Sequence, residues 1–585
     1  MLELRDISLA TGLQPDGEPL MLLRDIAAHF PKGHLCAIVG PSGSGKSTLL
    51  KVIAGIREPG KGAVHWEGRD LAQRDLDPHE IGYVPQFGIS FDLLTVAESI
   101  ETALRLRVGG MDRATRRLRS RELLADTGLD AIAGRRAGVL SGGQKRRLAL
   151  AIEMATQPIL LLCDEVTSGL DAKSEDEIVR LLTRLAHQGP GRAVLSVTHS
   201  LRHLDFHDSV AVLYEGRLVF HGAPELLSHY FSIGGPEQLF DCLQGRPADH
   251  WHHLWRDHRP AYYASLADPE TPVARATDTP FEGPPVDETF PIAPPTRLTF
   301  QPPSWLTQFS VLLGRQRRLL FRDHAQLILQ LALLFGFPCL VVIFAWDGLP
   351  QIANFAASIP QNPIQQIVAD TTFTLQAVRI GGLVSGLVMF QVILLTLMGS
   401  NNSAREIAGQ RAIFEKEKFA GLRPSAFLAS KTIYLAVVVG AQSLWMSLFV
   451  NTICHFPGDL FSQALILCGV NAAMTSLCLG ISAQMKTPDQ ASLLSVYLVG
   501  FQLPLSGAIL ALPGTLAAIT RPFIAAYWGW SGYLETMRDT RFYDIVTMTS
   551  RTTLSAYPIC ACVLLAHILA GLILAWFGVR ESRWD

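Results

Sequence analysis

The chain has 585 residues, which is too long for a single hydrophobic core, so we expect several domains. Its formal net charge of −2 gives no basic excess, which argues against a nucleic-acid partner. Hydrophobic residues make up 49% of the chain, and the long apolar runs fall almost entirely after residue 324. We therefore expect an α/β domain first and a membrane domain after it.

The N-terminus carries neither the basic segment nor the apolar segment of a secretory signal. We therefore expect the first domain to stay in the cytosol. The nine cysteines show no C-x-x-C spacing, and most of them lie in apolar runs. From this pattern we predict neither a disulfide nor a cysteine metal site.

A glycine-rich loop (GPSGSGKST) lies between an apolar strand run at 35–39 and a helical run at 47–54. It matches the phosphate loop, in which glycines let backbone N–H groups and a helix N-terminus converge on an anion. Lys46 is predicted to bind the β- and γ-phosphates, and Ser47 to bind Mg²⁺. The predicted ATP-binding residues of this loop are Gly40, Pro41, Ser42, Gly43, Ser44, Gly45, Lys46, Ser47 and Thr48.

Two acidic residues end a second buried strand run, at 159–163. A carboxylate at the end of such a strand can hold Mg²⁺, directly or through water, which predicts that role for Asp164. The next carboxylate can orient or deprotonate the attacking water, which predicts a catalytic role for Glu165. Alone, this pattern is more often a strand that meets a solvated loop, but the preceding phosphate loop favours the catalytic interpretation.

The sequence LSGGQ at 140–144 opens a helical stretch and makes a second possible anion site. The alternative is an ordinary helix cap. One nucleotide cannot easily contact two phosphate sites on the same domain. We therefore predict that two domains face each other, with each ATP between the phosphate loop of one and the LSGGQ of the other. The residues predicted to bind ATP in trans are Ser141, Gly142, Gly143 and Gln144.

These motifs resemble those of ABC-transporter ATPases, in which LSGGQ is the signature. The resemblance implies that Gln86 is the Q-loop glutamine, which contacts ATP and Mg²⁺, and that residues 168–171 form the D-loop. It also implies that His199 is the switch histidine that contacts the γ-phosphate and acts with Glu165 in catalysis. ATP and Mg²⁺ are the implied cofactors, with Ser47, Gln86 and Asp164 as metal ligands.

The sequence departs from this family in two places. Val166 stands where the family usually has proline, a change that removes no functional group, so we still expect hydrolysis. The segment 10–22 offers no aromatic residue to stack on adenine, which leaves the choice between ATP and GTP open. The predicted ATPase domain, an α/β P-loop fold, covers residues 1–235.

Residues 236–303 are predicted to form an extension and a proline-rich linker. The histidine-rich patch at 250–258 lacks defined ligand spacing, so solvated or packed histidines are favoured over a metal site. Residues 304–322 predict a basic amphipathic helix. This connecting helix would lie along the cytosolic membrane interface or pack on the ATPase domain, and the two alternatives are compatible.

The membrane domain, residues 323–585, is predicted to be all α-helical with six spans. The basic loop after the second span should be cytosolic. Parity then places the loop at 513–555 outside, although it carries four arginines. The predicted spans are roughly 325–346, 378–400, 431–454, 461–484, 490–512 and 556–578.

The segment 411–431 resembles the coupling segment of ABC-2-type permeases. Glu415 and Glu417 in this segment are expected to contact the ATPase domain. The order of ATPase, basic connecting helix and six spans resembles the G subfamily of ABC transporters (the White and pleiotropic-drug-resistance type). This resemblance implies a half-transporter that works as a homodimer, with a heterodimer as the alternative.

We therefore predict an ATP-driven exporter of a lipid-like or amphipathic substrate, set in the lipid bilayer of a plasma or inner membrane. The first alternative is an ATP-driven mechanotransmitter that regulates a membrane or envelope partner without transport. An importer is disfavoured because the ATPase precedes the permease in one chain. Arg379, near the outer end of the second span, either marks a functional site or extends its side chain to the headgroups.

Overall fold

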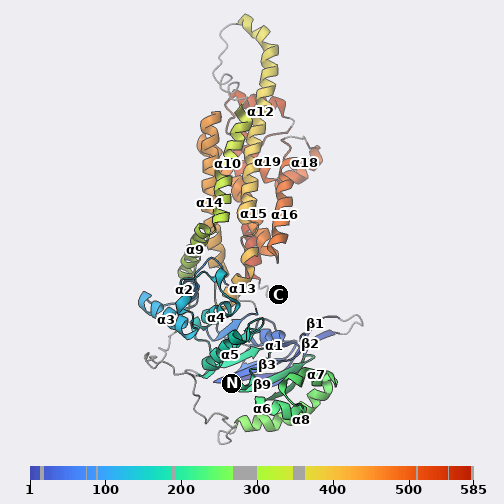
Figure 1. Cartoon of the computed structure of the whole chain (residues 1–585). Coiled ribbons are helices and arrows are strands. Elements are labelled where there is room, and N and C mark those ends of the chain that lie inside the picture. Colours follow the sequence, from blue (N-terminus) through green and yellow to red (C-terminus); the bar gives the residue numbers. More distant parts are fainter. Residues whose placement is uncertain are drawn as a thin grey trace. The chain divides into compact units, whose positions relative to one another are not determined.

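The computed structural model describes residues 1–13, 19–73, 76–86, 90–187, 191–267, 300–346, 363–508, 512–550 and 552–581. The chain divides into two compact units, which are drawn in Figure 1. The ATPase unit comprises Met1–Ser304 with Phe419–Gly421, and the membrane unit comprises Trp305–Lys418 with Leu422–Asp585. Much of the predicted proline-rich linker, residues 268–299, lies outside the described residues.

The ATPase unit contains two sheets. One has four strands in the order β2-β1-β4-β5, and the other has six in the order β10-β9-β3-β8-β7-β6. In the six-stranded sheet β9, β3, β8, β7 and β6 pair in parallel, so their carboxyl ends share one edge. The strands are β1 Leu2–Leu13, β2 Pro19–Phe30, β3 His34–Val39, β4 Lys61–Trp66, β5 Arg69–Asp70, β6 Ile81–Val84, β7 Leu160–Asp164, β8 Ala193–Val197, β9 Ser209–Tyr214 and β10 Arg217–Gly222.

Helices surround these sheets, and a buried ion pair joins two of them. The Arg107 guanidinium on α2 donates to both carboxylate oxygens of Glu153 on α4, at 2.9 and 3.0 Å. His252, in the histidine-rich patch, lies on α8 and donates from Nδ1 to the Leu218 carbonyl. The helices are α1 Lys46–Ile53, α2 Val96–Arg107, α3 Arg113–Asp126, α4 Gly142–Glu153, α5 Ala172–His187, α6 Pro224–Phe231, α7 Leu239–Gln244 and α8 Ala248–Ala267.

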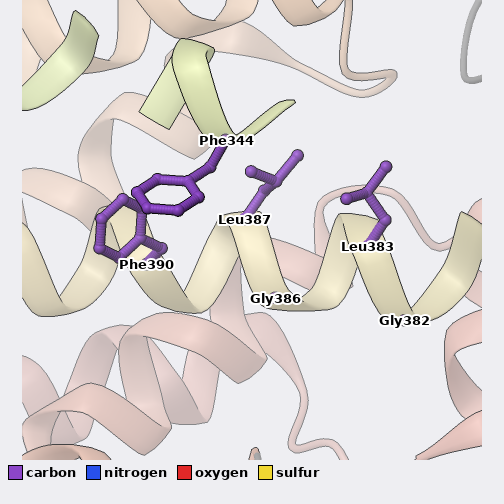
Figure 2. A pocket seen from close by; sticks show the side chains of 6 residues that line it. All are labelled: Phe344, Gly382, Leu383, Gly386, Leu387 and Phe390. Atoms are coloured by element: carbon purple, nitrogen blue, oxygen red, sulfur yellow. The ribbon is translucent and has the colours of Figure 1, made fainter. Parts of the chain in front are cut away.

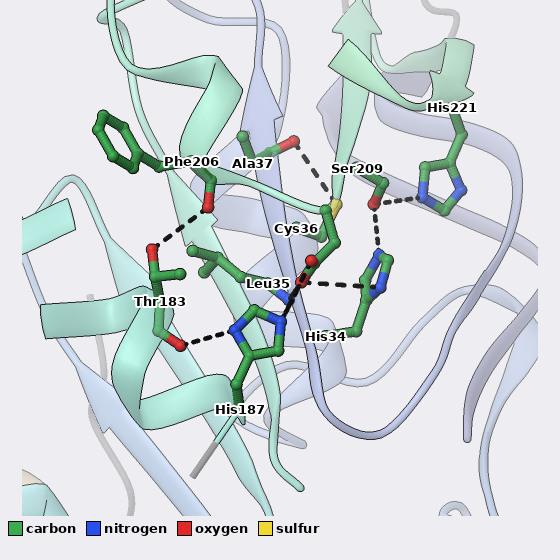
Figure 3. A network of polar contacts seen from close by, with 10 residues as sticks. His34, Leu35, Cys36, Ala37, Thr183, His187, Phe206, Ser209 and His221 are labelled. Carbon is green, nitrogen blue, oxygen red and sulfur yellow. Dashed lines mark hydrogen bonds and ion pairs between the residues drawn. The ribbon is translucent and has the colours of Figure 1, made fainter. Parts of the chain in front are cut away.

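A buried polar network connects β3, β9, β10 and α5 (Figure 3). Ser209 is fully buried, and its hydroxyl bonds to the rings of His34 at 2.7 Å and His221 at 3.1 Å. The neighbouring carboxylate of Asp208 accepts from the backbone of Leu35 and from the ring of His187. Burial lowers the pKa of His221 to about 3, so this ring is neutral in the folded protein at physiological pH.

Replacing His221 by glutamine should make the stability of the ATPase unit less sensitive to acid. Between a pKa near 6.5 in the unfolded chain and about 3 in the fold, only the unfolded chain binds the proton. The folded state therefore loses about 1.4 kcal/mol per pH unit from this group as the pH falls below 6.5. Thermal unfolding midpoints between pH 7 and 5 should fall less steeply in His221→Gln than in the wild type.

The exposed His253 on α8 provides the control, because His253→Gln should keep the wild-type dependence on pH. Parallel curves for the wild type and His221→Gln would show that the buried ring does not contribute to the acid sensitivity.

The regular elements in the described residues of the membrane unit are all helices. Five of its helices, α10, α12, α14, α15 and α21, are long and apolar enough to cross a membrane. The helices are α9 Trp305–Arg322, α10 His324–Ala345, α12 Pro363–Ser403, α13 Arg411–Phe419, α14 Pro424–Cys454, α15 Leu460–Gln484, α16 Pro488–Gly500, α17 Gln502–Leu505, α18 Gly514–Thr520, α19 Ala525–Glu535, α20 Arg541–Thr549 and α21 Tyr557–Arg580.

The expected span at 490–512 is the one that these five helices do not include. Helix α16 ends at Gly500, and α17 begins only at Gln502. Pro504 has no N–H to donate to the Gly500 carbonyl, and its ring crowds that carbonyl, which explains a break at this point. The count of six spans is therefore not confirmed, and residues 509–511 lie outside the described part of the chain.

Small residues allow α15 and α21 to approach closely. A Cβ added to Gly571 on α21 would lie 2.3 Å from the backbone of Ser476 on α15. A Cβ added to Gly578 would lie 2.4 Å from the Ala483 carbonyl. Such contacts are typical of membrane helices, whose association depends on close van der Waals packing.

A cluster of neutral amides joins four of the apolar helices. The Gln442 amide on α14 donates to Gln330 on α10 at 3.0 Å and accepts from Asn402 on α12 at 2.8 Å. Asn471 on α15 donates to the same Gln442 oxygen at 3.2 Å. The members of this amide cluster satisfy one another, as polar groups inside a membrane protein must.

Helix α13 gives Glu415 and Glu417 partners inside the membrane unit. Glu417 forms a bidentate ion pair with Arg315 on α9. Glu415 is buried, 3.7 Å from Arg411 and 3.9 Å from Lys418. Both carboxylates thus hold α13 to its own unit, and their expected contact with the ATPase domain stays a prediction. Reversing their charge would therefore disturb the membrane unit itself.

Candidate functional site

Residues 40–48 connect the end of β3 to the start of α1. A Cβ added to Gly40 would lie 2.1 Å from the Leu213 carbonyl, so only glycine fits there. Gly45, which precedes α1, has a φ of 96°, a left-handed conformation that favours glycine. The sequence therefore allows the tight loop whose N–H groups lead into the N-terminus of α1.

Lys46 begins α1, and its side chain folds back against this loop. The ammonium donates to the carbonyls of Gly40 at 2.8 Å and Pro41 at 2.7 Å, and the residue is only 5% exposed. Burial lowers the pKa of Lys46, while the carboxylates of Glu165 and Asp164 act in the opposite direction. One cation and two anions are thus concentrated where the strand ends meet.

Ser47 and Asp164 form the part of the site that suits a metal. The Ser47 hydroxyl donates to Asp164 Oδ1 at 2.7 Å, and the Tyr83 hydroxyl donates to Asp164 Oδ2 at 3.1 Å. Burial raises the pKa of Asp164 and outweighs the opposing effect of the hydrogen bonds from Ser47 and Tyr83. A hydroxyl and a carboxylate oxygen side by side match the oxygen ligands that Mg²⁺ prefers.

The carboxylate of Glu165 is held from both sides. Gln86 donates its amide N–H to Oε2 at 2.6 Å, and Nε2 of His199 lies 2.8 Å from Oε1. Three residues that are far apart in the sequence are thus brought together at the ends of β6, β7 and β8. Glu165 also has a φ of 50°, which is rare for a residue other than glycine and is typical of functional sites.

The LSGGQ segment begins α4. The Ser141 side chain accepts from the Gln144 backbone at 3.4 Å, and the Gln144 side chain accepts from the Ser141 backbone at 3.1 Å. This capping box is the ordinary helix cap that the sequence left as an alternative. Ser141 and Gly142 are exposed, and within the described residues no hydrogen bond joins this segment to residues 40–48.

Two residues of the site were not predicted from the sequence. Tyr83 lies on β6, whose register with β7 carries its hydroxyl to Asp164. Arg146 on α4 is buried, its Nη1 has no hydrogen-bond partner in the described structure, and Glu165 acts to raise its pKa against the larger effect of burial. Two signals in the sequence could have indicated these residues. One is a polar residue inside an apolar strand, and the other is an arginine on the buried face of α4.

Comparison with known proteins assigns both units to families. Residues 23–168 match the family model described as ABC transporter, and residues 307–528 match the one described as ABC-2 type transporter. A solved dimeric ATP-binding cassette bound to ADP and phosphate is 30% identical and covers 38% of this chain and 99% of its own, with a TM-score of 0.35.

One curated relative is similar over most of this chain, and another is similar over about a third of it. An ABC transporter ATP-binding/permease protein of Mycobacterium tuberculosis is 28% identical over 88% of this chain and 56% of its own length. A sulfate/thiosulfate import ATP-binding protein of Bacillus cereus is 38% identical over 35% of this chain and 57% of its own. The chain thus spans a little over half the length of these relatives. It carries an ABC transporter ATPase domain, followed along the chain by an ABC-2 type membrane domain.

Proposed function

We propose that the chain is an ATP-driven exporter that works as a homodimeric half-transporter in a plasma or inner membrane. The observation that carries the proposal is the Glu165 carboxylate, held by Gln86 and His199 beside the Ser47–Asp164 pair. The ATPase domain would comprise residues 1–235 and the connecting helix residues 304–322. The membrane domain would comprise residues 323–585, with the loop at 513–555 outside.

Hydrolysis assigns each of these groups a role. The loop at 40–48 and Lys46 would bind the phosphates, and Ser47, Asp164 and Gln86 would hold Mg²⁺, which neutralises phosphate charge when it is bound. Glu165 would orient the attacking water and accept its proton. His199 would contact the γ-phosphate, and its bond to Glu165 fixes the carboxylate for that task.

Glu165→Gln should lower ATP turnover at least a hundredfold while ATP binding is retained. The amide keeps the shape of the side chain but cannot accept a proton from water, and a general base contributes about 10²–10⁴ to the rate. Steady-state phosphate release and binding of labelled ATP measure the two effects.

The matched control is Glu225→Gln on α6, an exposed carboxylate that should leave turnover unchanged. Near-normal turnover in Glu165→Gln would remove this residue from the catalytic role.

The exposed residues Ser141 and Gly142 support a site shared between two chains. Ser141 and Gly142 are at the surface and make no hydrogen bond to the phosphate loop in the described structure. Their exposed N-terminal turn of α4 would complete the ATP site of a second copy. Each homodimer would then have two composite sites, each with Ser141, Gly142, Gly143 and Gln144 from the opposite chain.

Mixing two inactive variants should restore activity. A Lys46→Met chain lacks a working phosphate loop, and a Gly142→Asp chain lacks a working LSGGQ segment, so each homodimer should be inactive. A pair with one chain of each kind contains one intact composite site. Purified mixed pairs, isolated with two different tags, should therefore hydrolyse ATP in a single-turnover assay. Inactive mixed pairs would show that one chain supplies the whole site.

An apolar cavity in the membrane unit supports a lipid-like or amphipathic cargo. The cavity has a volume of about 330 Å³ between α10 and α12, and Figure 2 shows Phe344 and Phe390 at one end of it. Gly382 and Gly386 also line it, and a Cβ added to either would meet no atom within 4 Å. Arg379 precedes Gly382 by about one turn of α12, so a cation lies one turn from the residues that line the pocket.

The proposal predicts ATP-dependent movement of an amphipathic anion. Proteoliposomes loaded with a fluorescent short-chain phospholipid should show directional transfer between leaflets when ATP is supplied on the ATPase side. Gly386→Leu should slow the transfer by filling the cavity, whereas Gly440→Leu on α14, where a Cβ also meets open space, should not.

Glu165→Gln is the inactive control for this transfer. ATP turnover without any transfer of this probe or of other amphipathic probes would favour the alternative, a mechanotransmitter that regulates a membrane or envelope partner.

A further inference from the structure

A cavity of about 640 Å³ lies beside the four-stranded sheet of the ATPase unit. Strands β1, β2 and β4, of which β1 and β2 run side by side in Figure 1, contribute Ser8, Met21 and Lys61 to its wall. Arg217, at the start of β10, closes another side. The volume is within the range of pockets that bind small molecules.

This cavity lies apart from the phosphate loop, although Ala10, Pro19 and Met21 of its lining belong to the segment 10–22 discussed above for base stacking. Leu23 faces the phosphate loop, because a Cβ on Gly45 would lie 2.8 Å from the Leu23 side chain. Successive side chains of a strand point to opposite faces, so Arg24 points away from that loop. None of residues 40–48 lines the cavity.

Basic side chains outnumber acidic ones around the cavity. Three basic side chains line it, and Asp25 is the one acidic residue among its described lining. Asp25 accepts from the Ser8 hydroxyl at 3.1 Å and lies 3.7 Å from Arg217, which also pairs with Asp249 at 2.7 Å. The charge of Arg217 is therefore compensated, while Arg24 and Lys61 supply positive charge that these pairs do not balance.

Arg24 has an unused donor at this place. Its Nε is buried and has no hydrogen-bond partner among the residues that the structure describes. A buried donor without a partner is unfavourable, and a guanidinium binds phosphate oxygens in a well-defined geometry. Lys61 is exposed and can supply a second charge, while Leu9, Pro19 and Met21 offer apolar contact beside it.

Backbone hydrogen bonds lead from this cavity to the phosphate loop. The Arg24 N–H donates to the Gly216 carbonyl at 2.7 Å, and the Gly216 N–H donates to the Ser44 carbonyl at 3.1 Å. Gly216 also precedes Arg217, so the turn between β9 and β10 touches both the cavity and the loop. A ligand that restrains Arg24 and Arg217 would also restrain Gly216, and through its hydrogen bond the backbone of Ser44.

We propose that this cavity is an allosteric site for a small organic phosphate, distinct from the ATP site. The phosphate binds Arg24 and Lys61, and the apolar part of the ligand lies against Met21. Through Gly216 the bound ligand changes the affinity of the phosphate loop for nucleotide. This site requires neither transport nor dimer formation.

Phenyl phosphate is a suitable probe, because it combines a phosphate with an apolar ring. We expect the full chain in nanodiscs, saturated with Mg²⁺ and a non-hydrolysable ATP analogue, to bind one phenyl phosphate per chain in a calorimetric titration. The affinity should fall at least tenfold in R24Q/K61Q. The control R113Q/R117Q removes two exposed arginines from α3 and should bind like the wild type.

Equal affinity in R24Q/K61Q and the wild type would overturn the proposal. So would binding that disappears when the analogue saturates the chain, because it would place the probe in the phosphate loop. If R24Q/K61Q fails to fold, K61Q alone, which changes an exposed side chain, must still weaken binding at least threefold.

The allosteric part has its own test. Phenyl phosphate should change the Kd of the ATP analogue, and the analogue should change the Kd of phenyl phosphate by the same factor, because coupling between sites is reciprocal. An unchanged Kd for the analogue in the presence of bound phenyl phosphate would overturn the coupling through Gly216.

Discussion

The parallel register of β3, β8 and β7 determines the geometry of the ATPase site. Val197 on β8 lies opposite both Ile38 on β3 and Asp164 on β7, so the strands end at the same level. The Glu165 N–H extends this pairing by donating to the Val197 carbonyl at 3.2 Å. The loop at 40–48, the two acids and His199 each lie at or directly after one of these strand ends. A slip of one residue in any strand would separate them and turn their side chains to the other face.

The membrane unit is held together by two different kinds of contact. Between α15 and α21, glycines let backbones approach so closely that dispersion forces act over a long contact. Around Gln442 the helices are joined by neutral amides instead, which stay uncharged at any pH and avoid the cost of burying a charge in lipid. The ionic contacts that we described, such as Arg315 with Glu417, involve α9 and α13, which precede the apolar helices α10 and α14 in the chain.

The sequence was most informative where chemistry restricts the residue type. A phosphate loop needs its glycines, and two acids at the end of a buried strand are unusual, so Gly40, Lys46 and Asp164 could be named as candidates before the structure showed where they lie. Tyr83 could not, because a tyrosine in a buried strand is usually part of the core, and only the β6–β7 register reveals its bond to Asp164.

Contacts between distant segments escaped prediction for the same reason. The ion pair of Glu417 was not predicted, because local sequence does not show that Arg315, about a hundred residues earlier, pairs with it. The break after Gly500 was visible in principle, since Pro504 cannot donate to that carbonyl, but hydropathy alone counts it within an apolar run.

The backbone of Glu165 has an unfavourable conformation at the position that we propose to be catalytic. A left-handed conformation at a residue with a side chain costs on the order of 1–3 kcal/mol, and glycine would adopt the same φ of 50° without that strain. Glycine would also delete the carboxylate that Gln86 and His199 hold. Selection of variants for thermal resistance alone would therefore tend to discard this side chain, so an engineered, heat-stable form of this domain must keep position 165 fixed and gain its stability elsewhere.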